Sequence, residues 1–233
     1  MIVDLSSSLH DGMIYPHSSR TVSLNLKAVR VEEDEVSIMD GSGYGSGAGY
    51  VDTKCDKAFT EVYLESHHGT HVDAPAHTQP DGKTIDQYPL SKFINNTCQF
   101  IDLSSYDLSD PRGIPKKILE AVIPADCSVS ALVFATGVGN PPPSYSYFSP
   151  SGAMYLMDRF KGLQIIGVDS WSVDPSGDDF PAHRLFFNKD VLPLEGLVNL
   201  KSLPSPPKIF KLHCAPLSYV GADAAQVRAY AEW

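Results

Sequence analysis

The segment LQIIGVDS, residues 163–170, decides the fold class. It is a short apolar run that ends in polar residues, the pattern of a buried strand. Two similar runs precede it, TCQFIDLS at 97–104 and VSALVFAT at 129–136. Segments with helical spacing separate these runs, and strands that alternate with helices indicate an α/β class with a mixed sheet. Other predicted strands follow one another without a helix, which argues against a simple doubly wound fold.

The remaining elements can be placed by the same reasoning. Ser149 followed by Pro150 is a favourable N-cap and first position for one helix. The predicted helices cover 114–122, 149–160 and 180–190. The further predicted strands cover 1–6, 21–29, 59–66, 191–197 and 209–217.

Length and composition indicate one globular domain that spans residues 1–233. The formal net charge of −10 would repel a phosphate backbone, so nucleic acid is not an expected partner. Nothing approaches eighteen consecutive apolar residues, and the first residues lack the pattern of a signal peptide, so no membrane association is expected. The four cysteines are far apart and are read as free thiols in a reducing compartment, which predicts a cytoplasmic protein.

A glycine-rich stretch, DGSGYGSGAGY, occupies residues 40–50. So many glycines are incompatible with a regular element, because each adds backbone entropy that folding must remove. The stretch is either a flexible surface loop or a lid that carries Tyr44 or Tyr50 over a pocket.

The chemistry is concentrated in ESHHGTHVDAPAH, residues 65–77. Glycine, proline and β-branched residues make a helix improbable here. In an extended chain, residues of one parity share a face. The odd-numbered face then carries His67, His71, Asp73 and His77, whereas the opposite face is apolar, with the even-numbered Val62, Leu64, Val72 and Ala74. His68 points the other way in this interpretation and is expected to be replaceable.

Imidazole and carboxylate side chains together suit a divalent metal, Zn²⁺ or Mn²⁺. Three protein ligands would leave a coordination position open, as catalytic sites do. His77, if it lies near the metal without binding it, could move a proton. The alternative is a polar strand whose histidines only form local hydrogen bonds.

The motif HHGTHVDAPAH resembles the signature of the metal-dependent cyclase family, which includes bacterial kynurenine formamidase and isatin hydrolase. Further similar segments are IVDLSSSLHDGMIYP at 2–16, GVDSWSVDP at 167–175, PLEGLVNL at 193–200 and APLSYVGADAAQVRAYA at 215–231. The resemblance implies a single swivelling β/β/α-type domain with a mixed sheet. It also implies a homo-oligomer, a dimer or a tetramer.

The resemblance further implies roles for individual residues. His67, His71 and Asp73 match the first metal ligands, and His77 matches the proton-transfer histidine. His183 and Glu195 stand where the ligands of a second metal would fall, so one or two ions per chain are expected. Glu195 also lies in an apolar strand, where a buried carboxylate needs a partner.

Three functions are compatible with these residues. The first is a metal-dependent amidohydrolase, arylformamidase-like, that cleaves a carbon–nitrogen bond of a small-molecule amide by metal-activated water with His77 as proton shuttle. The second keeps the fold and the metal for lactone opening, cyclisation or dehydration. The third is a non-catalytic, metal-stabilised binding protein. Tyr15, Tyr44 and Trp171 are candidate substrate-binding aromatics.

Overall fold

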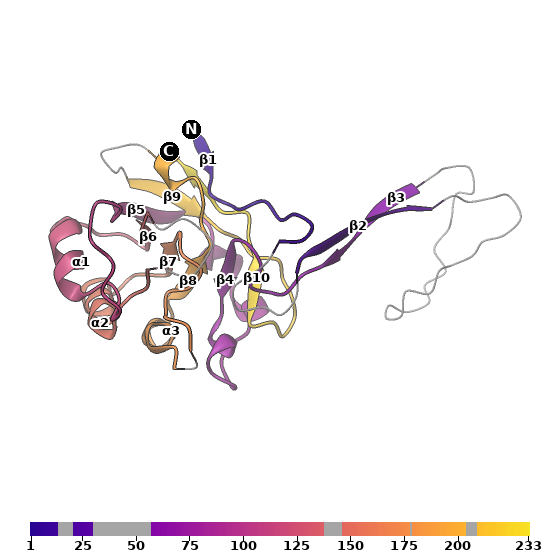
Figure 1. Ribbon diagram of the computed structural model, residues 1–233. Helices are drawn as coiled ribbons and strands as arrows, with labels where there is room; N and C mark the ends of the chain where they lie inside the picture. The colour runs from indigo at the N-terminus through magenta and orange to yellow at the C-terminus, as the bar shows by residue number, and fades with distance from the viewer. Residues whose placement is uncertain (14–20, 30–56, 138–145, 178, 204–208) are drawn as a thin grey trace, which may run out of the picture.

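The computed structural model describes residues 1–233 apart from 14–20, 30–56, 138–145, 178 and 204–208 (Figure 1). The strands are β1 (Ile2–Asp4), β2 (Ser23–Val29), β3 (Lys57–Tyr63), β4 (His71–Asp73), β5 (Asn96–Asp102), β6 (Ala131–Ala135), β7 (Ile165–Val168), β8 (Leu192–Glu195), β9 (Ile209–His213), β10 (Ala224–Gln226) and β11 (Tyr230–Glu232). The α-helices are α1 (Lys116–Val122), α2 (Pro150–Arg159) and α3 (Pro181–Phe187). Short 3₁₀ helices are η1 (Pro75–His77), η2 (Ile85–Gln87), η3 (Leu90–Lys92) and η4 (Leu200–Ser202).

Nine strands form one mixed sheet in the order β1-β11-β9-β5-β6-β7-β8-β4-β10. The central strands β5 to β8 run parallel, and the flanking pairs are antiparallel. The mixed α/β class predicted from the sequence is therefore confirmed. The order of the elements along the chain explains this mixture of parallel and antiparallel strands. Helices follow the central strands, whereas β9, β10 and β11 succeed one another without a helix.

The central strands are buried on both faces, which explains their continuous apolar sequence. On β6, Leu132 and Phe134 face a core shared with the three helices. Ala131 and Val133 face a second core, to which the outer strands β4, β10 and β11 also contribute side chains. The sheet thus curves around the second core, and the helices cover its opposite face (Figure 1).

The predicted start of the helix at 149–160 agrees with the structure of α2. Ser149 caps this helix, since its Oγ accepts a hydrogen bond from the backbone N–H of Gly152 at 3.1 Å. The helix buries Leu156 and Met157 against the sheet. The helix predicted at 180–190 is shorter in the structure than in the prediction, since α3 covers only Pro181–Phe187.

β2 and β3 form a separate hairpin that projects from the body (Figure 1). Their register runs from Ser23↔Tyr63 to Val29↔Lys57, and among the described strands they pair only with each other. Val62 and Tyr63 at the base of the hairpin are 51% and 69% exposed. Val62, which parity places on the apolar face, is therefore exposed.

The alternation predicted that the histidine segment is one extended strand, but the structure divides it into several elements. β3 ends at Tyr63, a turn follows, and only residues 71–73 are a strand before η1 begins at Pro75. The parity argument holds within β4, where Val72 packs into the core opposite its two neighbours. It fails on either side, because a turn and a helical segment have no period of two.

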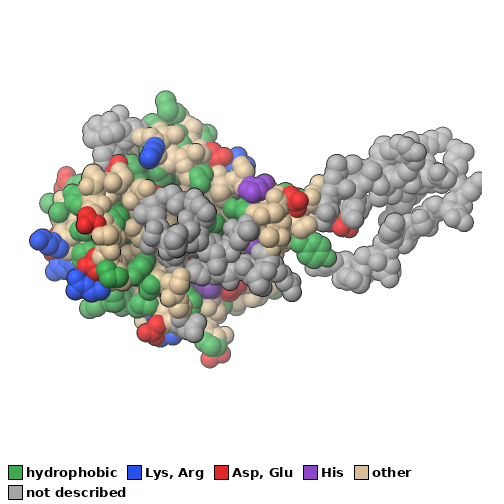
Figure 2. All heavy atoms as spheres, viewed as in Figure 1, with side chains coloured by type: hydrophobic (Ala, Val, Ile, Leu, Met, Phe, Trp, Pro, Cys, Tyr) green, Lys and Arg blue, Asp and Glu red, His purple; other side chains and the backbone are tan. Residues whose placement is uncertain are grey.

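On the face seen in Figure 2, basic side chains lie mainly at the edge over α1, among acidic ones. No helix in the described part of the chain is long and apolar enough to cross a membrane. Cys98 and Cys214 are buried free thiols, and burial raises the pKa of the Cys214 thiol to about 12.

Candidate active site

Strand β4 supplies the centre of the site. His71 and Asp73 lie on the same face of this strand, and both are fully buried. The antiparallel register pairs His71 with Glu195 of β8 on one side and Asp73 with Ala224 of β10 on the other. Strand pairing therefore brings residues from distant parts of the sequence to one point.

The turn before β4 brings His67 to the same point. Gly69 has a φ of +71°, and a Cβ there would lie 2.7 Å from Leu9 Cδ2. Only glycine is free of both the backbone strain and the collision. The carbonyl oxygen of Gly69 lies 3.0 Å from Nδ1 of His71, which donates to it and so leaves the lone pair of Nε2 facing Asp73. The missing side chain of Gly69 thus makes room for Leu9.

Asp73 has the surroundings of a metal ligand. Its Oδ1 lies 3.0 Å from His67 Nδ1 and 3.3 Å from His71 Nε2. Ligands of a tetrahedral zinc lie roughly 3.3–3.6 Å apart, given bonds of about 2.0–2.2 Å. Among the described residues this buried oxygen accepts no hydrogen bond, which is unusual for a buried polar atom. Three donor atoms that converge on one point in this way fit a divalent cation.

His183 and Glu195 lie on the other side of Asp73. His183 Nε2 is 3.1 Å from Asp73 Oδ2 and 3.5 Å from Glu195 Oε1. Glu195 Oε2 is 3.5 Å from His71 Nε2, so the two carboxylates connect the three histidines. The structure thus brings together all five residues that the sequence predicted as metal ligands.

Asp174 was missed by the sequence analysis. Its carboxylate accepts hydrogen bonds from His183 Nδ1 at 2.8 Å and from the backbone N–H groups of Ala182 and His183 at the start of α3. His183 therefore presents Nε2 to the site, as expected for a metal-binding histidine held by a carboxylate. The only hint in the sequence was an aspartate before Pro175 in a loop that follows a strand.

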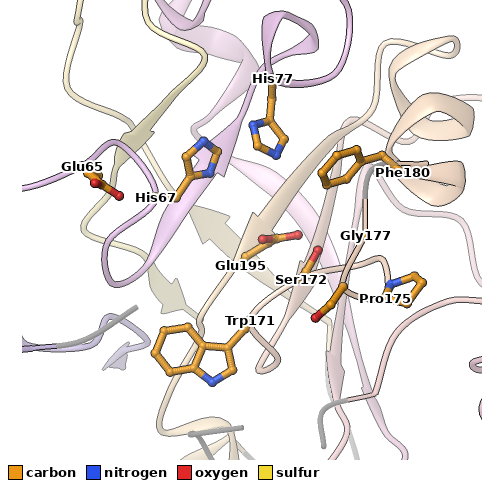
Figure 3. A pocket seen from close by; sticks show the side chains of 10 residues that line it. Glu65, His67, His77, Trp171, Ser172, Pro175, Gly177, Phe180 and Glu195 are labelled. Atoms are coloured by element: carbon orange, nitrogen blue, oxygen red, sulfur yellow. The ribbon is translucent and has the colours of Figure 1, made fainter. Parts of the chain in front are cut away.

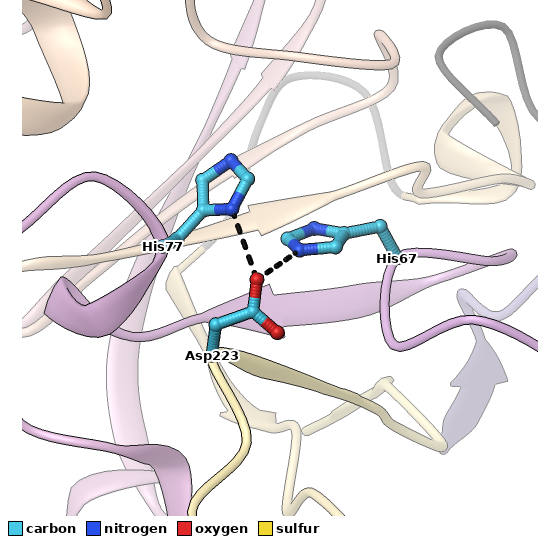
Figure 4. Close-up of side chains that lie close together, drawn as sticks. All are labelled: His67, His77 and Asp223. Atoms are coloured by element: carbon cyan, nitrogen blue, oxygen red, sulfur yellow. Dashed lines mark hydrogen bonds and ion pairs between the residues drawn. The ribbon is translucent and has the colours of Figure 1, made fainter. Parts of the chain in front are cut away.

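Asp223 was also missed. Its Oδ2 lies 2.9 Å from His67 Nε2 and 3.2 Å from His77 Nδ1 (Figure 4). His77, from η1, has its ring 4.2 Å from that of His67, and its ligand atom also lies within reach of Asp73 and His183. No local pattern around Asp223 distinguishes it, because its partners are 146 and 156 positions away.

The site favours positive charge. Burial by itself lowers the pKa of an imidazole, but Asp73 and Asp223 outweigh this effect and raise the pKa of His67 to about 9. In the same way, Asp73 and Glu195 raise the pKa of His71 to about 10, and Asp174 and Asp73 raise that of His183 to about 10. The carboxylates thus stabilise cations here, and a divalent metal would compete with these protons.

A cavity of about 320 Å³ opens beside the cluster (Figure 3). His67, His77 and Glu195 line it, and Trp171 contributes an almost fully buried ring. Phe180 lines it as well, with its ring 5.4 Å from that of His77 and an unusual φ of 40°. Such a backbone is strained for a bulky residue and is typical of functional sites. Of the predicted aromatics, Trp171 lies at the cavity, whereas Tyr15 and Tyr44 lie outside the described residues.

His68 stands apart from the cluster, but it is not a dispensable surface residue. Its side chain is 1% exposed, and its Nδ1 accepts a hydrogen bond from the backbone N–H of Glu65 at 2.7 Å. It therefore stabilises the turn that positions His67. The expectation that His68 is replaceable conflicts with this buried hydrogen bond.

The Cyclase family model matches residues 3–175, which include β4, the turn before it and η1. The match covers well over half of the chain. The chain belongs to the Cyclase family. The resemblance inferred from the histidine motif is therefore confirmed.

Named relatives agree with this membership of the Cyclase family. A kynurenine formamidase of Salinibacter ruber is 34% identical over 172 residues, covering 71% of this chain and 76% of that protein. One of Geobacillus thermodenitrificans is 32% identical over 176 residues, covering 72% and 77%. The crystal structure of an isatin hydrolase bound to the product analogue thioisatinate superposes with a TM-score of 0.69 over 99% of this chain and 91% of that one. Its sequence is 20% identical, so it supports the fold.

Proposed function

We propose that this protein is a metal-dependent hydrolase of a carbon–nitrogen bond in a small-molecule amide, similar to an arylformamidase. The observation that carries the proposal is the convergence of His67, His71 and Asp73 beside a cavity that His77 also lines. The kynurenine formamidases at 34% and 32% identity support an amide as the substrate. The rings of Trp171 and Phe180 suit a planar aromatic part of that substrate.

A divalent metal held by this cluster would supply Lewis acidity and a water of lowered pKa. We propose zinc or manganese, because the donors combine imidazole nitrogen with carboxylate oxygen. We further propose two ions per chain. His67, His71 and Asp73 would hold one, and His183, Glu195 and Asp73 would hold the other.

His77 is placed to move protons. Its Nδ1 is engaged by Asp223, which leaves Nε2 for the reactants. In the proposed reaction, Nε2 takes a proton from the attacking water as the new carbon–oxygen bond forms. It returns this proton to the amide nitrogen as the carbon–nitrogen bond breaks, which yields a carboxylic acid and an amine. The strained backbone of Phe180 holds an aromatic ring against the same imidazole.

The decisive experiment combines substrates with metal analysis in one sample. Purified protein is incubated with N-formylkynurenine, isatin and simple lactones, before and after chelation, and metal is quantified in parallel. We expect amide cleavage that chelation abolishes and added Zn²⁺ or Mn²⁺ restores. Lactone opening without amide cleavage would favour the alternative reactions on the same fold. Bound metal without any turnover would favour a binding protein.

We also propose a homo-oligomer, a dimer or a tetramer. An isolated two-stranded hairpin is marginally stable in water, yet β2 and β3 project from the body with Val62 and Tyr63 exposed. A second copy of the chain would cover such a hairpin. We expect light scattering coupled to size exclusion to give at least twice the chain mass of 25.4 kDa. A single-chain mass over a wide range of protein concentrations would contradict this proposal.

For the cellular setting we propose the cytoplasm. The buried free thiols of Cys98 and Cys214 suit a reducing compartment.

A further inference from the structure

The carboxylate of Asp223 contacts the imidazole rings of both His67 and His77. Asp223 directly precedes β10, and its backbone oxygen accepts a hydrogen bond from the N–H of Ala74 at 2.8 Å. This bond and the pairing of β10 with β4 fix the main chain of Asp223 beside the strand that carries Asp73. Sheet register therefore sets where the Asp223 side chain starts.

The two oxygens of Asp223 have different partners. Oδ1 accepts a hydrogen bond from Ser66 Oγ at 2.9 Å. Oδ2 receives both imidazoles, His67 Nε2 at 2.9 Å and His77 Nδ1 at 3.2 Å (Figure 4). Ser66 thus orients the carboxylate so that a single oxygen serves two rings.

We propose that Asp223 is a positioning residue that fixes the tautomers of the metal-binding His67 and of His77 together. An imidazole that donates from one nitrogen must present the other as a lone pair. The hydrogen bond to Asp223 directs the Nδ1 lone pair of His67 toward Asp73 and its proposed metal. The same oxygen holds the proton on Nδ1 of His77, so that Nε2 enters the cavity able to accept a proton. This inference rests on the proposed function for the role of His77, but not for the tautomers.

Asp223 and Asp174 differ in burial and in the number of imidazole rings that they contact. Asp174 is fully buried and contacts one imidazole ring among the described residues, that of His183, whereas the Asp223 side chain is 39% exposed and contacts two. A change at Asp223 should therefore alter metal affinity and proton transfer at once. Asp223 does not line the cavity, so substrate affinity should change little.

The test compares Asp223→Asn with the wild type, both loaded with Zn²⁺, by ¹⁵N NMR of the histidine rings. We expect His77 to shift from the Nδ1–H toward the Nε2–H tautomer in the variant. Zinc titration should give an affinity lower by about 10–100-fold, as is typical when a ligand loses its outer hydrogen-bond partner. At saturating zinc, kcat should fall by about 10²-fold or more, with KM little changed. An unchanged His77 tautomer, or unchanged zinc affinity, would overturn the proposal.

Two further variants sharpen the result. Asp86→Asn is the matched control, because Asp86 accepts a hydrogen bond from Gly221 in the same turn but touches neither histidine. It should leave the ring signals and zinc affinity at wild-type values, and a tautomer shift equal to that of Asp223→Asn would overturn a specific role. If Asp223→Asn does not fold, Ser66→Ala replaces it, since it frees the carboxylate to rotate. A shift of His77 in the same direction then supports the proposal, and wild-type ring signals overturn it.

The ring and zinc measurements involve no substrate. A protein that cleaves no amide would end the proposed function, while the NMR and titration results would still decide the role of Asp223.

Discussion

Replacing Asp73 by alanine is expected to abolish tight metal binding and, with it, amide hydrolysis. Asp73 directs Oδ1 toward His67 and His71 and Oδ2 toward His183, so its loss disables both halves of the cluster at once. Metal affinity should fall by more than the factor of about 10–100 that is typical when a ligand loses only its outer hydrogen-bond partner. Elemental analysis after dialysis and metal titration measure it directly.

Glu195→Ala is the matched comparison for this experiment. Glu195 contacts His183 and His71 but leaves the group of His67, His71 and Asp73 intact. We expect this variant to retain one ion per chain where the wild type binds two. If Asp73→Ala keeps its full metal content, the assignment of the centre is wrong. If Glu195→Ala keeps the wild-type count, the site holds a single ion.

The second large effect is expected at His77. His77→Ala should lower kcat by about 10²–10⁴-fold, the usual contribution of a positioned acid–base group, while the metal content stays unchanged. The reason is that Nε2 of this imidazole is the group proposed to carry the proton from water to the leaving nitrogen. Steady-state kinetics and elemental analysis on the same preparation provide both readouts.

His10→Ala is a suitable control for this variant, because His10 is exposed and lies outside the cluster. It should behave as the wild type in both measurements. His77 also lies close to Asp73 and His183, at a distance from which it could bind a metal. A fall in metal content in His77→Ala would therefore make His77 a ligand and refute its role as proton shuttle.

Much of the fold could be predicted because its signals are local. The continuous apolar runs of β5, β6 and β7 mark strands buried on both faces, and Ser149 with Pro150 marks the start of α2. The hairpin register and the curvature of the sheet could not be predicted, because they depend on contacts between residues that are distant in sequence.

The site residues also divide into those that local sequence could predict and those that depend on distant contacts. Alternation correctly placed His71 and Asp73 on one face, since both lie in β4. The grouping of His67 and His77 was correct, but its predicted cause was wrong: a turn at Gly69 and the helical segment η1 bring them in. Asp223 could not be predicted and Asp174 had only a weak local signal, because their roles depend on histidines that are distant in sequence or contacted only in the folded chain.

The register of β4 between β8 and β10 has a consequence for the lifetime of the folded state. The proposed ligands Asp73 and His183 are 110 residues apart, so a metal bound between them would act as a cross-link that closes a long loop. Binding only to the folded chain would stabilise it in proportion to the logarithm of metal concentration over the dissociation constant. Metal supply would then govern resistance to proteolysis as well as catalysis.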